Sequence, residues 1–394
     1  MALIDKLTDI ADAIREKTGT TDKLTLEAMP TAITAIETGG GGADLPDEAF
    51  LITGVCNYRF ANNGWDWFIE ELGDKVTTKD ITSCYSMFQG SKVEQIPFDI
   101  NIKNATSLPY MFEGVLKITT APKIRGTIKW STSTKLTQLL SACSNLRTLE
   151  DVFTPEMLEG FSTVKVTSAY STPDVGLLLQ NCYSLRQIPS WWYKFKLNPE
   201  STAFPSASST LYYQSFKYCY SLNEVTNIPV WSCAGAQTSN MFLNTLTDST
   251  RLKNLTFETN SDGSPIEAKW KSQIIDFAYV GYCATSGSRY CILNNNSGIT
   301  ADKEVTDDAS YQALKNDPDW FTSKIEYSRY NHDSAVNTIN SLPDTSAYLA
   351  TAGGTNTIKF KGAAGSLTDG GAINTLTAEE IAVATAKGWT VTLS

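Results

Sequence analysis

The residue types needed for hydrolytic chemistry are scarce in this 394-residue chain, which contains a single histidine, His332. A Ser–His–Asp arrangement would have to use this side chain as its base, yet the sequence has no Gly-x-Ser-x-Gly turn to present a nucleophilic serine. His332 stands between Asn331 and Asp333, a polar setting that predicts a surface turn. We therefore expect a protein that is not an enzyme and predict no catalytic residue.

Acidic side chains are the other candidates for chemistry. Asp302, Glu304, Asp307 and Asp308 lie close together, but the regular Asp-x-Asp-x-Asp-Gly calcium loop with its distant Glu is absent. The sequence also has no His/Cys cluster with zinc spacing and no phosphate-binding loop. We expect these acids to form a solvated face and predict no metal and no cofactor. A carboxylate pair that cleaves a glycan remains open, because such partners can lie far apart in sequence.

The charge of the chain argues against two classes of partner. Forty-two acidic and 32 basic side chains give a net charge of −10, and no basic stripe is present, which argues against nucleic acid and anionic membrane surfaces. No apolar run approaches the ~18 residues of a spanning helix. The start, Met1 to Lys6, has neither a basic head nor a continuous apolar core, so it does not predict a secretory signal. We therefore expect assembly in a cytoplasm and no membrane insertion.

Aromatic side chains near two insertions are the candidates for binding. Trp191, Trp192 and Tyr193 follow the end of a predicted strand, and neighbouring side chains of an extended segment point to opposite faces. At least one of the two tryptophans is therefore expected to be exposed, as an anchor for a protein or a sugar ring, unless a loop covers it. Of Tyr212 and Tyr213, we expect one to pack in the core and the other to contact solvent or a partner.

These insertions interrupt a recurring sequence motif, which we call the phrase. In it an apolar residue stands three positions before Cys and six positions before Leu, and Ile-Pro often follows. Close copies begin at Leu140, Leu179 and Phe216, and looser copies contain Met87, Met111, Met241 and Ala335. The copies recur at roughly 24 to 40 residues, a spacing typical of a solenoid whose neighbouring units bury each other's apolar faces. Chance recurrence in a Ser/Thr-rich chain is the alternative.

Cysteine usage favours buried, reduced thiols. Cys143, Cys182 and Cys219 occupy the same slot of the phrase, where a small apolar side chain fits a tight corner. Cys283 and Cys291 lie outside the phrase, and the sequence leaves their redox state open.

The phrase resembles the irregular bacterial surface leucine-rich repeats of the BspA-like kind, whose units read Phe-x-x-Cys-x-Ser-Leu-x-x-Ile. The resemblance covers about residues 81–360, with an uninterrupted part at 81–257 and an interruption at 258–333. It implies an irregular leucine-rich-repeat solenoid. Together with the segments at the two ends of the chain, it predicts an α+β fold in which this solenoid has an N-terminal helical arm and a C-terminal helix–strand cap.

Residues 1–42 predict a helical arm for attachment or oligomerisation. Two apolar series at helical spacing are separated by Thr18–Asp22, and the segment ends in the four glycines Gly39–Gly42. Such an arm cannot bury its own apolar stripe, so it must dock on copies of itself or on another protein. The predicted docking residues are Leu3, Leu7, Ile10, Ile14, Leu26, Met29, Ile33 and Ile36.

The sequence of Ile10–Gly19 and Lys23–Ile33 is similar to the N-terminal segment of many tail, baseplate and fibre proteins of bacteriophages and prophages. This resemblance implies an arm that contacts other virion proteins or oligomerises, with a homotrimer favoured. It carries over no catalytic residue. A helical hairpin that caps the solenoid is the alternative.

The remaining segments predict two caps and an excursion. Residues 43–80 form the N-terminal cap, residues 258–333 an inserted excursion, and residues 334–394 the last repeats and the C-terminal cap. In the excursion, the sequence predicts strands at Ile274–Tyr282 and Arg289–Leu293 and a helix at Ser310–Asn316.

The C-terminal cap carries the clearest local signals. Thr377-Ala378-Glu379-Glu380 predicts a capping box at the start of a helix, which ends at Gly388 and is followed by a strand at Trp389–Leu393. We expect Ile381, Val383 and Ala384 to fill the buried side of this helix.

Together these features predict a bacteriophage virion structural protein, a tail-fibre or baseplate-associated receptor-binding subunit that adheres to a host surface glycan or protein. Affinity would come from several copies that each bind weakly. In this interpretation, alanine at Trp191 and Trp192 weakens cell binding. Three alternatives stay open: a capsid decoration or head fibre with the same arm, a bacterial adhesin, and a particle-bound polysaccharide hydrolase with a buried carboxylate pair.

Overall fold

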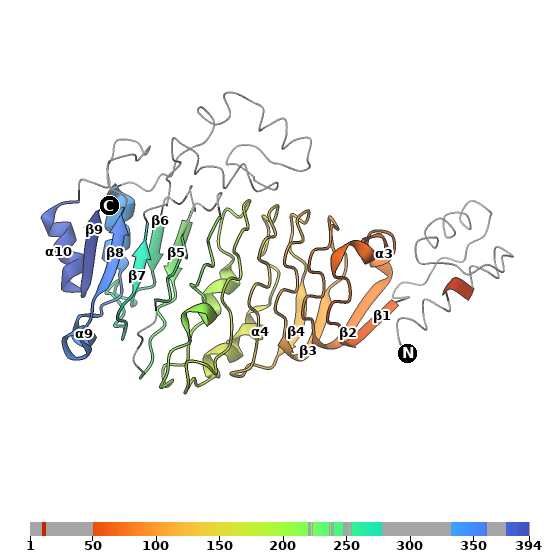
Figure 1. Ribbon diagram of the computed structural model, residues 1–394, viewed down its shortest axis with the longest axis horizontal. Coiled ribbons are helices and arrows are strands. Elements are labelled where there is room, and N and C mark those ends of the chain that lie inside the picture. Colours follow the sequence, from red (N-terminus) through yellow and green to blue (C-terminus); the bar gives the residue numbers. More distant parts are fainter. Residues whose placement is uncertain are drawn as a thin grey trace, which may run out of the picture.

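The computed structural model of the chain describes residues 10–12, 50–277, 332–360 and 376–393, with positions 220, 221, 223, 236, 238, 239, 247–251 and 253 excepted. This part of the protein is a mixed α/β structure with small parallel sheets and few helices, in agreement with the predicted α+β class at this coarse level. We call each turn of the chain, a strand or extended segment with the loops that lead to the next one, a coil. The coils form an elongated row in which β1 and β9 lie at opposite ends (Figure 1).

The strands follow one another in sequence order and pair in parallel, as β1-β2-β3-β4, β5-β6 and β7-β8-β9. They are β1 (Phe50–Val55), β2 (Val76–Ser83), β3 (Ile100–Ser107), β4 (Ile124–Ile128), β5 (Glu224–Ile228), β6 (Asn254–Phe257), β7 (Ile274–Asp276), β8 (Asn356–Phe360) and β9 (Trp389–Leu393). The α-helices are α3 (Asp66–Leu72), α4 (Pro155–Glu159), α8 (His332–Ser341), α9 (Ser346–Ala352) and α10 (Ala378–Ala386). The 3-10 turns are η1 (Asn62–Trp65), η2 (Gly73–Lys75), η3 (Gly160–Thr163), η4 (Ser190–Lys194) and η5 (Ala207–Ser209).

Of the predicted arm, only residues 10–12 are described, and they are helical. The other predicted docking residues lie outside the described residues: Leu3, Leu7, Ile14, Leu26, Met29, Ile33 and Ile36. Cys283, Cys291, the predicted strand Arg289–Leu293 and the predicted helix Ser310–Asn316 lie outside them too.

Successive coils share one backbone turn, in which two residues with positive φ stand four positions apart. The pairs are Tyr58/Asn62, Ser86/Gly90, Tyr110/Gly114, Gln138/Ala142, Leu177/Asn181 and Gln214/Tyr218. The close copies of the sequence phrase begin two residues after the first member of each of the last three pairs. Ten of these twelve residues are not glycine, so contacts between coils must hold an otherwise strained backbone.

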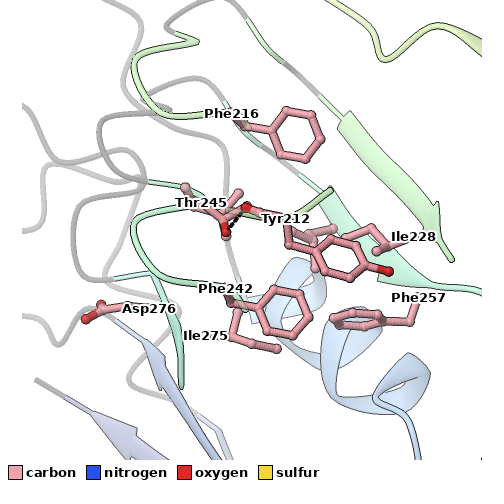
Figure 2. A pocket seen from close by; sticks show the side chains of 10 residues that line it. Tyr212, Phe216, Ile228, Phe242, Thr245, Phe257, Ile275 and Asp276 are labelled. Carbon is pink, nitrogen blue, oxygen red and sulfur yellow. Dashed lines mark hydrogen bonds between the residues drawn. The ribbon is translucent and has the colours of Figure 1, made fainter. Parts of the chain in front are cut away.

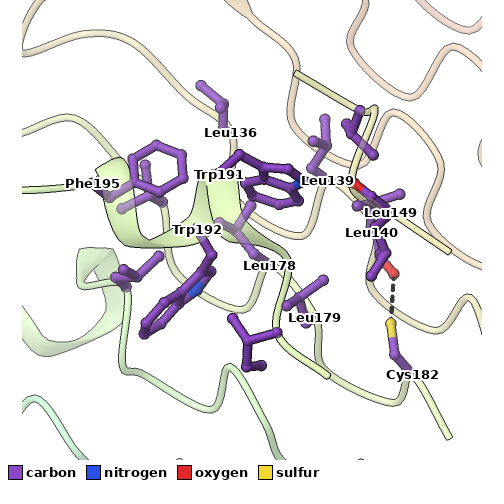
Figure 3. Close-up of a cluster of buried hydrophobic side chains, with 14 of the residues drawn as sticks. Leu136, Leu139, Leu140, Leu149, Leu178, Leu179, Cys182, Trp191, Trp192 and Phe195 are labelled. Atoms are coloured by element: carbon purple, nitrogen blue, oxygen red, sulfur yellow. Dashed lines mark hydrogen bonds between the residues drawn. The ribbon is translucent and has the colours of Figure 1, made fainter. Parts of the chain in front are cut away.

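Buried cysteine thiols form hydrogen bonds between neighbouring coils. The Sγ atoms of Cys143, Cys182 and Cys219 donate to the carbonyl oxygens of Phe112, Leu140 and Leu179, at 3.0, 3.2 and 3.1 Å. Figure 3 shows the Cys182 contact beside the buried leucines. All three are buried free thiols, as predicted, and burial raises the pKa of each one, that of Cys182 to about 12.

Tryptophans form a second link between coils. In each case the indole Nε1–H donates to a carbonyl oxygen on another coil or segment, which satisfies the polar atom of a large side chain. Trp130 is half-buried against the core, and the other four rings are buried in it. The pairs are Trp130 with Met157 (2.7 Å), Trp191 with Leu149 (2.6 Å), Trp231 with Phe195 (2.7 Å), Trp270 with Trp231, and Trp389 with Pro343 (2.9 Å).

The start of the predicted excursion at 258–333 needs correction. Trp270 is fully buried, and β7 pairs in parallel with β8 through Ile274 and Thr357. Residues 258–277 therefore belong to the row of coils. Their position is determined by pairing with a strand that is distant in sequence, and the turn residues in the local sequence do not show this pairing. The predicted strand Ile274–Tyr282 begins at the observed position, and its part after 277 lies outside the described residues.

The structure of the C-terminal cap confirms most of what the sequence predicts for this segment. Thr377 and Glu380 exchange the two capping-box hydrogen bonds, Glu380 N to Thr377 Oγ1 at 3.2 Å and Thr377 N to Glu380 Oε2 at 2.8 Å. Ala384 is buried, but Val383 is exposed, so its predicted burial is wrong. The helix ends at Ala386 with Lys387 as its C-cap, one residue before the predicted cap Gly388, and β9 follows as predicted.

Polar contacts at both ends tie α8 to α10. His332 begins α8 instead of lying in the predicted turn, and its Nε2 stands 3.0 Å from Glu380 Oε2. At the other end, Lys387 Nζ donates to the carbonyl oxygens of Ile339 and Asn340 at 2.9 and 2.6 Å. Burial lowers the pKa of Lys387 to about 8.

The His332–Glu380 contact makes stability depend on pH. Hydrogen bonds to Glu380 and then Asp333 raise the pKa of His332 above 6.5, so its contribution is full below pH 6.5 and is lost as pH rises through the folded-state pKa. Hydrogen bonds from the Thr377 backbone and then His332 lower the pKa of Glu380 below 4.5, so its contribution is full above pH 4.5 and is lost in acid. The contact therefore stabilises most between pH 4.5 and 6.5.

We expect His332→Gln to lower the Tm more at pH 5.5 than at pH 8, measured by thermal unfolding of the full chain. Glu379→Gln, at an exposed neighbouring carboxylate of α10, is the control and should show the same Tm difference at both values. An equal Tm loss for His332→Gln at both pH values would show that the contact carries no charge-dependent stability.

Candidate binding surface

The predicted exposure of a tryptophan at the first insertion is wrong. Trp191 and Trp192 are 2% and 0% exposed, and Figure 3 shows both rings within a cluster of buried apolar side chains. The segment is the 3-10 turn η4 after Pro189, and such a turn does not alternate side chains between two faces as an extended chain does. Neither ring has a surface to offer a host receptor.

The three predicted tyrosines divide between core and surface. Tyr212 is fully buried, and its hydroxyl donates to the Pro229 carbonyl oxygen. Tyr193 is half-buried, and burial raises its pKa to about 12. Tyr213 is also half-buried, with Gln214 Nε2 at 3.4 Å from its hydroxyl. The expected division between Tyr212 and Tyr213 matches their burial, whereas contact of Tyr213 or Tyr193 with a partner stays a prediction.

A small internal gap lies beside Tyr212, Phe216 and Phe242 (Figure 2). Most of its lining is apolar, including Leu255 and Phe257, and it holds no more than about one water molecule. A gap of this size and character is a packing defect in the core. It offers no ligand site.

An exposed aromatic surface lies instead just beyond the carboxyl ends of β1, β2 and β3. We name Tyr58, Tyr85 and Tyr110 the tyrosine row. The ring centroids of Tyr58 and Tyr85 are 5.1 Å apart, and those of Tyr85 and Tyr110 are 5.6 Å apart, both in edge-to-face geometry. Tyr58 is 58% exposed, and the other two are half-buried. The row therefore presents three neighbouring rings to solvent from three successive coils.

Strand register explains why these side chains meet. Val55 pairs with Ser83, and Ser83 pairs with Ser107, which places the three strand ends side by side. The tyrosines follow these residues by two or three positions. The same register continues through Lys135 to Asp174, so the surface extends past the third coil.

The tyrosine row is mounted on a rigid base. Tyr58 N donates to Tyr85 O at 2.9 Å, and Tyr110 N donates to Thr137 O at 3.1 Å, so the backbone of each coil is fixed to the next. Beneath the row, the buried rings of Phe60, Phe88 and Phe112 stack with centroids 5.2 and 5.5 Å apart. A ligand would find these tyrosines already positioned, which limits the entropy lost on binding.

Polar side chains flank the C-terminal end of the row. Both carboxylate oxygens of Glu113 accept from amides, Oε2 from Gln89 and Oε1 from Gln138 at 3.2 Å. Burial raises the pKa of Glu113, and it also raises that of Asp174, which accepts from the Gly176 N–H at 3.3 Å.

Tyr110 connects the rings to these carboxylates. Its pKa is raised by burial first and then by the nearby charges of Tyr85, Glu113 and Asp174. The arrangement can stack against flat apolar faces and can donate and accept hydrogen bonds at its rim.

Two features were searched for in the part of the chain that the structure describes: clusters of metal-ligating side chains and helices that could span a membrane. Within residues 50–277, 332–360 and 376–393, no three His, Cys, Asp or Glu side chains cluster so as to hold a metal ion. None of the helices in these segments has the length and hydropathy to cross a membrane. Comparison with protein-family models, curated proteins and solved structures finds no match for the chain.

Proposed function

We propose that the chain is a bacteriophage virion structural protein, a receptor-binding subunit of tail-fibre or baseplate type that is assembled in the bacterial host cytoplasm. The observation that carries the proposal is the tyrosine row, an exposed aromatic surface held on a rigid backbone. Exposed aromatic side chains on a fixed scaffold are frequent anchors for partners. The similarity of Ile10–Gly19 and Lys23–Ile33 to phage tail and fibre proteins supports the particle context.

The body is, in this proposal, an irregular leucine-rich-repeat solenoid of the BspA-like kind. Parallel strands in sequence order, the recurring pair of positive-φ residues and the cysteine links between coils support it. In such a body each coil buries its apolar face only against its neighbours, so the length of the row can grow without a larger core.

Residues 1–42 serve as the arm that contacts other virion proteins and joins the chain into a homo-oligomer, with a trimer favoured. Three copies would present three tyrosine rows to one cell surface. Linking weak sites in this way raises avidity without any new contact, provided that the geometry lets the sites bind together.

Adsorption competition tests the receptor-binding role. Full-length protein, added to host cells before particles that carry this chain, is expected to slow particle adsorption because free protein occupies the same receptors. Serum albumin at equal mass controls for nonspecific coating. Unchanged adsorption, together with no retention of the full-length protein on washed cells, would contradict the proposal.

A further inference from the structure

We infer that the tyrosine row, together with Glu113 and Asp174, is the receptor site itself, and that its ligand is a neutral polysaccharide of the host surface. This inference rests on the proposed receptor-binding function and specifies the class of ligand. It follows from three properties of the surface: the shape of its apolar part, the chemistry of its rim and the sign of its charge.

The apolar part fits a chain of flat rings. Sugar rings have C–H faces that pack against aromatic side chains, and tyrosine offers a rigid ring at a small cost in conformational entropy. The three rings follow one another at 5.1 and 5.6 Å along the direction in which the coils stack. An extended polymer lying along this direction would meet one ring after another.

The rim fits hydroxyl groups. A sugar hydroxyl both donates and accepts, and the rim supplies both partners: amide groups of Gln89 and Gln138, and carboxylate oxygens of Glu113 and Asp174. Hydrogen bonds from a hydroxyl to a carboxylate are stronger than those between neutral groups. The two amides also hold Glu113 in place, so this acceptor is oriented before any ligand arrives.

The charge argues against anionic ligands. Single-stranded nucleic acid also stacks on aromatic rings, but it needs a positive groove for its phosphates. Here Glu113 and Asp174 lie beside the row, and the positive charge of Lys135 is opposed by Asp174. Teichoic acids and other phosphate-containing wall polymers meet the same repulsion. A neutral polysaccharide combines the ring faces with the hydroxyls and avoids it.

Binding of the full-length chain to host cell-wall polysaccharide tests the inference. The polysaccharide is separated by anion exchange into neutral and anionic fractions, and each fraction is titrated against wild type and three variants. Tyr58→Ala/Tyr85→Ala removes two rings, and Tyr58→Phe/Tyr85→Phe keeps them. Tyr170→Ala is the matched control, because Tyr170 is 96% exposed but lies outside the row.

We expect wild type and Tyr170→Ala to bind the neutral fraction equally. The double alanine variant should bind about tenfold more weakly or worse, and the double phenylalanine variant should stay within a few fold of wild type. Circular dichroism of all variants checks that the fold is kept. If the double alanine variant unfolds, the single variant Tyr58→Ala takes its place, because Tyr58 is 58% exposed, and it too is expected to bind the neutral fraction more weakly than wild type.

Three results would overturn the inference. Undiminished binding by a folded double alanine variant would place the site elsewhere, and binding confined to the anionic fraction would reject the ligand class. If wild type slows particle adsorption but binds neither fraction, the receptor is a protein and the proposed function survives without this inference. If wild type neither slows adsorption nor is retained on washed cells, the proposed function fails first.

Discussion

Trp191→Ala is expected to lower the free energy of unfolding by about 3–5 kcal/mol. The indole is 2% exposed, packs edge-to-face against Phe153 at 5.2 Å and Phe195 at 6.3 Å, and bonds to the Leu149 carbonyl. Its removal leaves a cavity between coils and an acceptor without its donor. Denaturant unfolding of the full chain, followed by tryptophan fluorescence and circular dichroism, measures the loss.

Phenylalanine at the two adjacent tryptophans separates the hydrogen bond from the ring. Trp191→Phe leaves the Leu149 oxygen without its donor, which costs about 1–3 kcal/mol. Trp192 is equally buried, but its Nε1 has no hydrogen-bond partner among the described residues, so Trp192→Phe should cost less. Equal losses for the two phenylalanine variants would contradict the role assigned to the Trp191 bond.

The burial of both tryptophans changes how a cell-binding defect of their alanine variants is interpreted. Alanine at Trp191 and Trp192 is still expected to weaken binding, but through loss of the fold instead of loss of a contact. Only variants of exposed side chains, such as Tyr58, can identify a receptor site in this protein.

Gly126→Ala is expected to lower the free energy of unfolding by about 3 kcal/mol. Gly126 pairs with Ile102 between β3 and β4, and a Cβ atom there would stand 1.9 Å from the Ile102 carbonyl oxygen. Its φ of +104° adds conformational strain for any residue with a side chain. The two strands must therefore move apart, which weakens the first sheet.

Gly263→Ala is the matched control for this prediction. Gly263 also has a positive φ, +81°, but an added Cβ would meet nothing within 4 Å. It should lose only the conformational part, about 1 kcal/mol. The two unfolding midpoints in urea give the comparison, and similar shifts would show that β3 and β4 do not approach as closely as described.

Local sequence signals predicted the local structure well. Thr377 and Glu380 define a helix start through hydrogen bonds within four residues, so the sequence contains all the information needed. Cys143, Cys182 and Cys219 share a slot because each coil repeats the same turn, and their burial follows from that repetition.

Features that depend on contacts between coils could not be predicted in the same way. The orientation of Trp191 and Trp192 depends on a 3-10 turn whose formation after Pro189 leaves no clear local signal. The place of residues 258–277 depends on pairing of β7 with a distant strand.

The tyrosine row was missed because its members sit at unequal distances from the phrase. Tyr58 and Tyr110 precede Phe60 and Phe112 by two positions, whereas Tyr85 precedes Phe88 by three. Only the strand register brings the three rings together. An alignment of the coils on their buried phenylalanines would have shown a tyrosine before each of the three.

Antibody labelling of intact particles tests most directly whether the chain is a virion subunit of tail-fibre or baseplate type. Antibodies raised against the full-length chain are applied to purified particles of the phage or prophage that encodes it, and gold label is located by electron microscopy. We expect label at the tail end of the particle. Label on the head would replace this role with capsid decoration, and label on cell surfaces with none on particles would contradict the virion role.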